Sequence, residues 1–299
     1  MTKISAFLNL VRWKNLALII YIQIVLKYVF FNTFKVQTQL TALQFIILLA
    51  AIVLITAAGY IINDIFDIKS DQINKPHKVI VGNYFSIEIA KKFYFFCNAL
   101  GIIFGVAISL NVQQPSLVFI FLGASLLLYF YSKKLKSKPF IGNLIVSLLI
   151  ALSILTLAFF ELNNLQIAFP FTVILTLCLF AFFLNLAREI IKDIEDINGD
   201  YKLNMNTLPI LLGSKRARYI AAFLCALPLG LLLFLVINFN ELHLFTKSYL
   251  VVFVILPLLF ITLKLLKVTS KKSLNNISAM LKIIMFLGIS SLIIFSLNK

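Results

Sequence analysis

Long apolar segments follow one another along the whole of this 299-residue chain. Apolar residues make up 62% of the sequence and the mean hydropathy is +1.03, far outside the range of a soluble domain. Each segment holds roughly 17 to 22 residues, enough for a helix to cross the hydrocarbon of a bilayer. A transmembrane β-barrel would need apolar and polar residues in alternation, whereas these runs are continuous. We therefore predict an all-α, polytopic membrane protein.

Nine such segments predict nine transmembrane helices, packed as a bundle in a single transmembrane domain over residues 1–299. Residues 4–14 come before the first span and suit a short interfacial helix, with Trp13 at the headgroup level. No small-residue cleavage site follows, so we expect a retained anchor and not a signal peptide. The predicted spans are Leu16–Phe34, Thr41–Ile62, Phe93–Leu110, Pro115–Tyr131, Phe140–Phe160, Ile167–Ala187, Tyr219–Phe239, Tyr249–Leu263 and Ile277–Leu297.

The basic residues are divided very unevenly between the two sides of this predicted bundle. Of the 27 Lys and Arg residues, those on the poorer side are Lys27, Lys35, Lys247 and Lys299. By the positive-inside rule, the richer side is cytoplasmic. Topology and contact with anionic membrane lipid therefore account for the net charge of +16, and nucleic-acid binding is not expected. We expect an integral protein of the cell (inner) membrane.

All the aspartates of the chain fall in two short clusters on the predicted cytoplasmic side. Both clusters read D-x-x-D-x-x-x-D, and each lies where a long apolar segment ends. At 100° per residue, this spacing puts three carboxylates within about 60° of one helix face, where they repel each other unless cations hold them together. The alternative is that they only cap helices and solvate loops. The clusters are Asp64, Asp67 and Asp71, then Asp193, Asp196 and Asp200.

The two clusters match each other position for position, at a distance of 129 residues along the chain (Asp64 to Asp193). If the halves are spans 1–4 and spans 5–8, each half has two spans before its motif connection. This pattern predicts an internal duplication with span 9 appended. Direct repeats separated by an even number of spans keep the same orientation, so the two motifs should meet at one face.

Carboxylates in this arrangement predict a site for Mg²⁺ and a diphosphate. Mg²⁺ prefers oxygen ligands and is typically bound by one or two carboxylates together with substrate phosphates. Basic residues near the motifs could grip the phosphate oxygens, and they are Lys75, Lys78, Arg188, Lys192 and Lys202. Glu189 lies one turn before Asp193 and could either extend this site or pair with Arg188 or Lys192.

Several stretches resemble the UbiA superfamily of intramembrane prenyltransferases. N-D-I-F-D-I-K-S-D is similar to the first aspartate motif of that superfamily, and K-D-I-E-D-I-N-G-D is similar to the second. Arg12 and Asn15 resemble its R-P-x-N entry to the first span, with Trp13 in the place of Pro. Tyr131-Ser132 with Leu135-Lys136, followed by Gly142-Asn143, resembles a further stretch, Y-S-x-x-L-K and G-N.

The resemblance implies a central cavity capped by the two motif segments and a Mg²⁺-dependent transfer of a polyprenyl group from its diphosphate to a lipophilic acceptor. It implies metal ligation by the first motif and the second, at Asn63, Asp64, Asp67, Asp71, Asp193, Asp196 and Asp200. The catalytic residues would be Asp67, Asp71, Asp196 and Asp200. Substrate binding would involve Arg12, Asn15, Tyr131 and Lys136, with Lys78, Arg188, Lys192 and Lys202. Tyr60 and Tyr131 could face an allylic cation with their rings.

The stretch after Asp71, Q-I-N-K-P-H-K-V-I-V-G, is similar to that of the archaeal-type digeranylgeranylglyceryl phosphate synthases, with Lys78 in the place of an Arg and Val79 in the place of a Pro. This similarity favours a geranylgeranyl donor and a geranylgeranylglycerol phosphate-type acceptor. Prenylation of an aromatic quinone precursor is the alternative within the same reaction class.

Two alternatives come from other classes of membrane protein. A CDP-alcohol phosphotransferase would carry the motif D-G-x-x-A-R…G-x-x-x-D-x-x-x-D, which this sequence lacks. An Asp-dependent membrane transporter would place its carboxylates near the middle of the membrane, at broken helices. Both clusters here lie at the ends of spans, which favours the enzyme.

Overall fold

A computed structural model describes residues 2–36, 38–162, 168–239 and 242–297. Within these ranges the chain is helical, and its β structure is a single isolated bridge between Val81 and Phe85. The α-helices are α1 (Lys3–Leu10), α2 (Trp13–Ile24), α3 (Phe31–Thr33), α4 (Ala42–Phe66), α5 (Ile68–Asn74), α6 (Ile87–Asn111), α7 (Val118–Lys133), α8 (Ile141–Glu161), α9 (Ala168–Lys202), α10 (Leu208–Leu212), α11 (Ser214–Asn238), α12 (Leu244–Leu250), α13 (Leu256–Lys267) and α14 (Lys271–Leu297). Two π-helical segments, η1 (Val25–Phe30) and η5 (Val251–Ile255), and the 3₁₀ turns η2 (Pro76–Lys78), η3 (Pro115–Leu117) and η4 (Leu135–Ser137) complete the order.

In the described part of the chain, nine helical stretches are long and apolar enough to cross a membrane, as predicted. The first, Trp13–Thr33, joins α2, η1 and α3, and the eighth, Leu244–Lys267, joins α12, η5 and α13. The protein is therefore an integral membrane protein of the all-α class. The internal duplication of its two halves stays a prediction.

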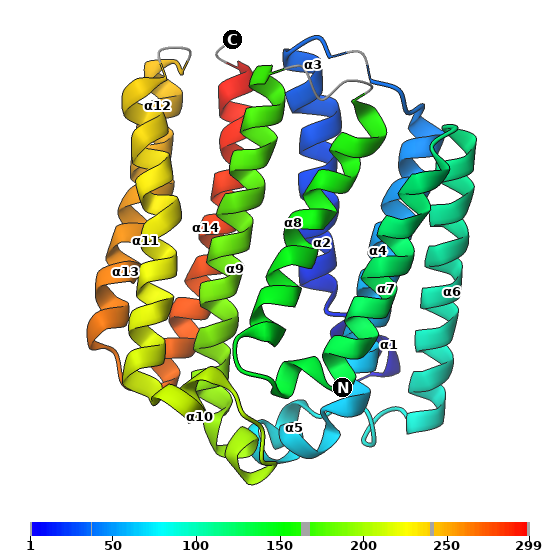
Figure 1. The fold of residues 1–299 in the computed structure, drawn as a ribbon, viewed down its shortest axis with the longest axis vertical. Helices are drawn as coiled ribbons and strands as arrows, with labels where there is room; N and C mark the ends of the chain where they lie inside the picture. Colours follow the sequence, from blue (N-terminus) through cyan, green and yellow to red (C-terminus); the bar gives the residue numbers. More distant parts are fainter. Residues whose placement is uncertain (1, 37, 163–167, 240–241, 298–299) are drawn as a thin grey trace.

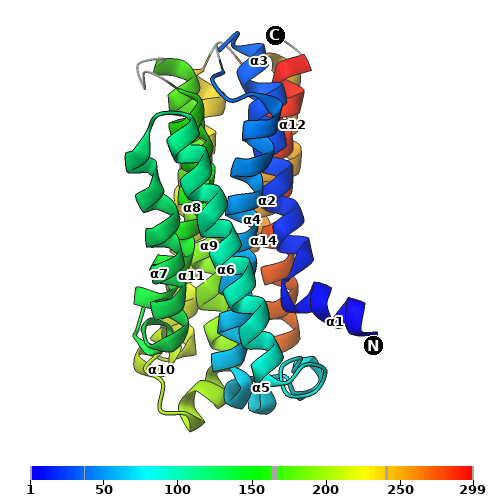
Figure 2. The ribbon, with the colours of Figure 1, turned by 90° about the vertical axis from the view of Figure 1, so that its right-hand side faces the viewer.

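The long helices run side by side along the longest axis of the molecule (Figures 1 and 2). Helices α6 and α7 lie on one flank and α11 and α13 on the opposite flank, with α2, α4, α8, α9 and α14 between them (Figure 1). Helix α1 lies at the same end of the bundle as α5 and α10, whereas α14 ends at the opposite end (Figure 1). The chain therefore crosses the bundle an odd number of times between α1 and the end of α14. This agrees with nine spans.

Local sequence explains where the helices that carry the site begin. Thr41 and Gln44 form a capping box at the start of α4, in which each side chain binds the other residue's backbone N–H. Arg12 has a φ of 51°, in the left-handed region, and this turn separates the short α1 from the first span. The predicted interfacial helix is thus present as α1, but it ends at Leu10, and Trp13 opens the spanning helix.

The second aspartate cluster lies on a helix and not in a connection. The apolar run predicted a span that ends at Ala187, but α9 continues as one helix to Lys202. Ile190, Ile191 and Ile194 are buried, and they keep this extension packed against the rest of the bundle. The predicted start of that span, Ile167, lies outside the described residues.

Candidate active site

A cavity of about 210 Å³ opens inside the bundle between α2, α4, α7, α8, α9 and α14. One part of its wall is apolar and includes Ile22, Ile55, Phe121, Leu128 and Ile154. The other part is polar, and the polar and charged side chains there are Arg12, Asn15, Tyr60, Asn63, Tyr131, Asn185, Arg188, Glu189, Lys192 and Lys282. The cavity therefore suits a molecule with one charged end and one hydrocarbon end.

The first aspartate cluster surrounds a break in the helix. Asp64 lies in the last turn of α4, Asp67 lies between α4 and α5, and Asp71 lies in α5. The prediction that all three share the face of one helix is therefore wrong for this cluster. The backbone N–H of Asp67 still bonds the carbonyl of Asn63, and that of Asp71 bonds the carbonyl of Asp67, so the break is short.

Each of two carboxylates in the first cluster pairs with a cation from a distant part of the sequence. Arg12 lies 3.0 Å from Asp64, and Lys136 forms an ion pair with Asp67. Asn63 also donates to Asp67, at 2.7 Å. The polar entry to the first span, the Lys136 stretch and the first aspartate motif therefore meet.

The second aspartate cluster lies along the last turns of α9. Asn143 donates a hydrogen bond to Asp193 at 2.8 Å, and Lys75 pairs with Asp196 at 2.5 Å. Asp200 is buried. Because α9 is continuous here, the prediction of a shared helix face holds for this cluster.

The two clusters meet at the same end of the bundle, which confirms that the motifs share a face. The Asn74 side chain joins them, because it donates to the Asp196 carbonyl and accepts from the Gly199 N–H, both at 3.0 Å. A Cβ atom at Gly199 would lie only 2.2 Å from the Asn74 amide nitrogen, so glycine leaves the space in which Asn74 makes these bonds. Lys75 adds the ion pair with Asp196 across the same junction.

Gly142 and Asn143 connect the turn that carries Lys136 to the second aspartate cluster. A Cβ atom at Gly142 would lie 2.8 Å from the Lys136 Cα atom, so glycine lets the η4 turn pack against the start of α8. The next residue, Asn143, reaches Asp193 on α9. One short stretch thus positions Lys136 over the first cluster and holds a carboxylate of the second.

The charges of the site shift the ionisation of its groups. Burial raises the pKa of the Asp71 carboxyl, and the nearby charge of Asp64 raises it further, against the opposing effect of Lys75. Burial also lowers the pKa of the Lys136 ammonium to about 8, although Asp200 opposes this shift. Carboxylates that repel each other in this way are stabilised when a cation binds between them.

The donor atoms at this end of the bundle fit Mg²⁺. They are carboxylate and amide oxygens, the ligands that hard divalent cations prefer. Two of them, Asn63 Oδ1 and Asp196 Oδ1, are shielded from solvent and accept no hydrogen bond from any described residue. Among the described residues no three Asp, Glu, His or Cys side chains converge on one point. Mg²⁺ bound at this end would share these protein oxygens with phosphate oxygens of a substrate.

Not every predicted substrate contact is found at the cavity. Lys202 is exposed and is not part of the cavity wall, and the Lys78 side chain lies outside the described part of the structure. Glu189 lines the cavity and pairs with both Arg188, at 3.1 Å, and Lys192, at 2.6 Å. Of the two uses considered for Glu189, the structure shows ion pairing, and a contribution to the metal site stays a prediction.

Lys282 is a charged residue of the cavity wall that was not predicted from the sequence as part of the site. Lys282 on α14 lines the cavity and donates a hydrogen bond to Asn15 at 2.8 Å. Asn15 in turn donates to the Tyr60 hydroxyl at 3.1 Å, and the Arg12 guanidinium lies 4.8 Å from the centre of the Tyr60 ring. An ionisable residue inside an apolar span indicates a function, and Lys282 is such a residue.

A bundle of spanning helices around a cavity that is charged at one end and apolar at the other, with two aspartate motifs beside the charged end, defines an intramembrane enzyme for amphiphilic, anionic substrates. The chain belongs to the UbiA prenyltransferase family, whose model matches residues 29–289. It is therefore a prenyltransferase.

Relatives with established names are similar over most of the chain. A digeranylgeranylglyceryl phosphate synthase from Saccharolobus solfataricus is 39% identical over 261 residues, which cover 85% of this chain and 84% of the relative. The protein of that name from Methanosphaera stadtmanae is 32% identical over 96% of this chain and 97% of its own length.

Solved structures share the fold. A structure described in work on digeranylgeranylglyceryl phosphate synthase in membranes superposes with a TM-score of 0.71 and 27% identity, over all of both chains. A UbiA homolog from Archaeoglobus fulgidus, bound to GPP and Mg²⁺, superposes with a TM-score of 0.62 and 17% identity, over 96% of this chain and 99% of that one.

Proposed function

We propose that this protein transfers a geranylgeranyl group from its diphosphate to geranylgeranylglyceryl phosphate, with Mg²⁺ as cofactor. The observation that carries the proposal is the cavity, whose charged end lies beside both aspartate motifs and whose other end is hydrocarbon. The similar proteins named digeranylgeranylglyceryl phosphate synthase support this choice of acceptor, and the UbiA homolog bound to GPP and Mg²⁺ supports the metal.

The aspartate motifs would hold the cofactor and, through it, the diphosphate. The ligands would come from Asn63, Asp64, Asp67, Asp71, Asp193, Asp196 and Asp200. When bound, Mg²⁺ supplies positive charge that stabilises the departing pyrophosphate. Arg12, Lys75 and Lys136 already lie beside these carboxylates, so they are placed to bind the phosphate oxygens that remain.

The reaction exchanges one carbon–oxygen bond for another. The bond between C1 of the prenyl group and the diphosphate oxygen breaks, and its electron pair leaves with pyrophosphate. The hydroxyl oxygen of the acceptor forms a new ether bond to C1, and its proton leaves with the pyrophosphate. The apolar wall, which includes Phe121 and Leu128, excludes water that would otherwise capture the allylic cation.

Two tyrosines lie where they could stabilise that cation. Tyr60 and Tyr131 both line the cavity near its charged end, and an aromatic ring attracts a cation to its face. The Asn15 hydrogen bond fixes the orientation of Tyr60. These contacts would lower the barrier without a proton transfer to the protein.

The active end of the bundle would face the cytoplasm, in the cell membrane. Supporting this orientation, the Lys and Arg residues are concentrated at the end that carries the motifs. The cavity and the motifs are built from helices across the chain, which supports a single transmembrane domain over residues 1–299.

Membranes containing the protein test the proposal when supplied with labelled geranylgeranyl diphosphate, Mg²⁺ and one acceptor at a time. We expect labelled digeranylgeranylglyceryl phosphate and release of pyrophosphate with geranylgeranylglyceryl phosphate. Product with only an aromatic acceptor such as a quinone precursor would replace the proposed acceptor. Ion uptake by vesicles without pyrophosphate release would instead indicate a transporter.

A further inference from the structure

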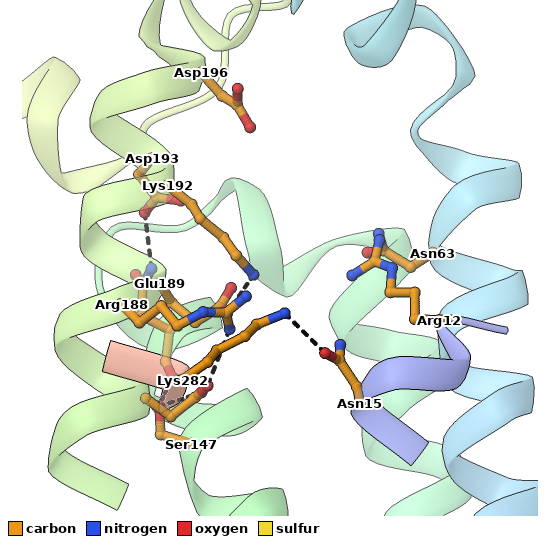
Figure 3. A network of polar contacts seen from close by, with 12 residues as sticks. Arg12, Asn15, Asn63, Ser147, Arg188, Glu189, Lys192, Asp193, Asp196 and Lys282 are labelled. Atoms are coloured by element: carbon orange, nitrogen blue, oxygen red, sulfur yellow. Dashed lines mark hydrogen bonds and ion pairs between the residues drawn. The ribbon is translucent and has the colours of Figure 1, made fainter. Parts of the chain in front are cut away.

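Three cations gather on one wall of the cavity, further inside the bundle than the second aspartate cluster. Arg188 and Lys192 lie on α9, and Lys282 reaches toward them from α14 (Figure 3). In this view Asp196 lies at one end of the polar network and Lys282 toward the other. We name Arg188, Lys192 and Lys282 the inner cation cluster.

The inner cation cluster has more positive charge than its neighbours neutralise. Within the described residues, its ion pairs are those of Arg188 and Lys192 with the single carboxylate of Glu189. Of the nearby motif carboxylates, Asp64 pairs with Arg12 and Asp196 pairs with Lys75. Asp193 accepts a hydrogen bond from the Asn143 amide. Excess charge inside a membrane protein is costly, so a second anion at this wall would be strongly stabilised.

The cluster also has hydrogen-bond donors to spare. Arg188 is only 9% exposed, and its Nε atom has no acceptor among the described residues. A guanidinium has five N–H donors and an ammonium has three. Within the described part of the chain, the Lys282 ammonium donates one hydrogen bond, to Asn15. A buried donor without a partner costs free energy, and a bound phosphate would supply the missing acceptors.

We propose that the inner cation cluster binds the phosphate of the glycerophosphate acceptor, with Lys282 as a residue that determines acceptor specificity. This inference rests on the proposed function. The aspartate motifs, with Arg12, Lys75 and Lys136, serve the diphosphate of the donor, so the two anionic groups occupy separate sites. With its phosphate bound to the inner cation cluster, the acceptor would place its glycerol hydroxyl between this cluster and the aspartate motifs. The C1 atom of the prenyl group becomes reactive in the same place.

The test compares Lys282→Gln with Lys272→Gln. Lys272 lies on the same helix but is exposed, so it controls for the loss of a lysine from α14. Binding of labelled geranylgeranylglyceryl phosphate is measured without geranylgeranyl diphosphate. EDTA is present to remove Mg²⁺, so that the metal-dependent site does not contribute to the binding. We expect Lys282→Gln to weaken this binding about tenfold or more, the effect of losing one charged hydrogen bond. Lys272→Gln and Lys282→Arg should bind as the wild type does.

Steady-state kinetics provides the second readout. For Lys282→Gln we expect a higher KM for the acceptor and an unchanged KM for geranylgeranyl diphosphate. A higher KM for the donor alone, or acceptor binding like that of the wild type, would overturn the inference while the proposed function stands. A wild-type protein that uses no glycerophosphate acceptor would overturn the proposed function itself. Lys192→Gln should repeat the acceptor effect, and unchanged acceptor binding in that variant would likewise contradict the cluster.

Discussion

At the scale of single residues, the site is organised by pairs of opposite charge. Arg12 with Asp64, Lys136 with Asp67 and Lys75 with Asp196 each join segments that are far apart in the sequence. Removing a carboxylate that binds Mg²⁺ should therefore be more harmful than removing an ordinary surface charge.

We expect Asp196→Asn to lower the rate of prenyl transfer about 100-fold or more, if Asp196 helps to hold the Mg²⁺ that stabilises the leaving pyrophosphate, as proposed. Asparagine keeps the size of the side chain, so the bundle should still form. The rate is measured over a range of Mg²⁺ concentrations, with Glu88→Gln as the control because Glu88 is exposed. Turnover near the wild-type rate at saturating Mg²⁺ would contradict a role for Asp196 in metal binding.

A buried ion pair at the other end of the bundle has a structural role. Lys27 pairs with Glu161, and Glu161, which is fully buried, also accepts from the backbone N–H groups of Gln39, at 2.9 Å, and Leu40, at 3.2 Å. The pair thus fixes the chain between the first and second spans to the end of α8.

We expect Lys27→Met to lower the free energy of unfolding by about 3 kcal/mol, because it leaves the Glu161 carboxylate buried without its cation. Adding Glu161→Gln should restore much of the loss, since the uncompensated charge is then gone. Thermal unfolding in detergent, followed by circular dichroism, measures both changes. A double variant less stable than Lys27→Met would show that Glu161 acts mainly through the backbone and not through Lys27.

At the scale of helices, the decisive feature is the contact between α5 and the end of α9. Asn74 makes this contact through two hydrogen bonds, and Gly199 leaves the space for it. The two aspartate clusters are held together across this junction, so their separation depends on it.

We expect Gly199→Ala to reduce prenyl transfer at least tenfold without unfolding the protein. The new methyl group would displace Asn74, whereas alanine favours α9 as a helix by up to about 1 kcal/mol over glycine. Activity and the unfolding temperature are both measured. Gly123→Ala on α7 is the matched control, since nothing lies within 4 Å of a Cβ atom there. Full activity in Gly199→Ala would mean that the junction does not set the geometry of the site.

The helices of the bundle follow from their apolar runs, and so does their number. The extension of α9 past Ala187 did not, because Asn198, Gly199 and three aspartates are poor helix formers. The spacing of Ile190, Ile191 and Ile194 was the available signal, since it places three buried side chains along one face. The break at Asp67 has no comparable signal in the sequence.

The site was predictable in part for similar reasons. The two matching groups of carboxylates predict a metal site, because they would repel each other without a cation, and the two motifs do meet. Their pairing with Arg12, Lys136 and Lys75 depends on tertiary packing, which local sequence does not encode. Lys282 lines the cavity but was not assigned to the site from the sequence, although a lysine among apolar residues indicates function in a membrane protein.

At the scale of the whole molecule, most of the Lys and Arg residues lie at the same end of the bundle as the site. Helices α1, α5 and α10 lie there with both aspartate motifs, and the opposite end carries α3 and the end of α14 (Figures 1 and 2). A soluble Mg²⁺ ion and the pyrophosphate product must enter and leave through the end with the motifs. Orientation in the membrane therefore decides which compartment supplies the cofactor.

Single-cysteine reporters test this orientation. Gln72 on α5 and Tyr201 near the end of α9 are exposed at the motif end, and Asn111 at the end of α6 is exposed. The native Cys97, Cys178 and Cys225 are buried, so an impermeant thiol reagent should spare them.

We expect reporters at Gln72 and Tyr201 to react only when the reagent reaches the cytoplasmic face, and one at Asn111 only from outside, because about 30 Å of hydrocarbon separates the two faces. Intact cells and inverted membrane vesicles provide the two exposures. Both motif reporters reacting from outside would reverse the orientation but keep the site. Reaction of Gln72 and Tyr201 from opposite faces would separate the two aspartate clusters across the membrane, and no diphosphate could then be bound by both.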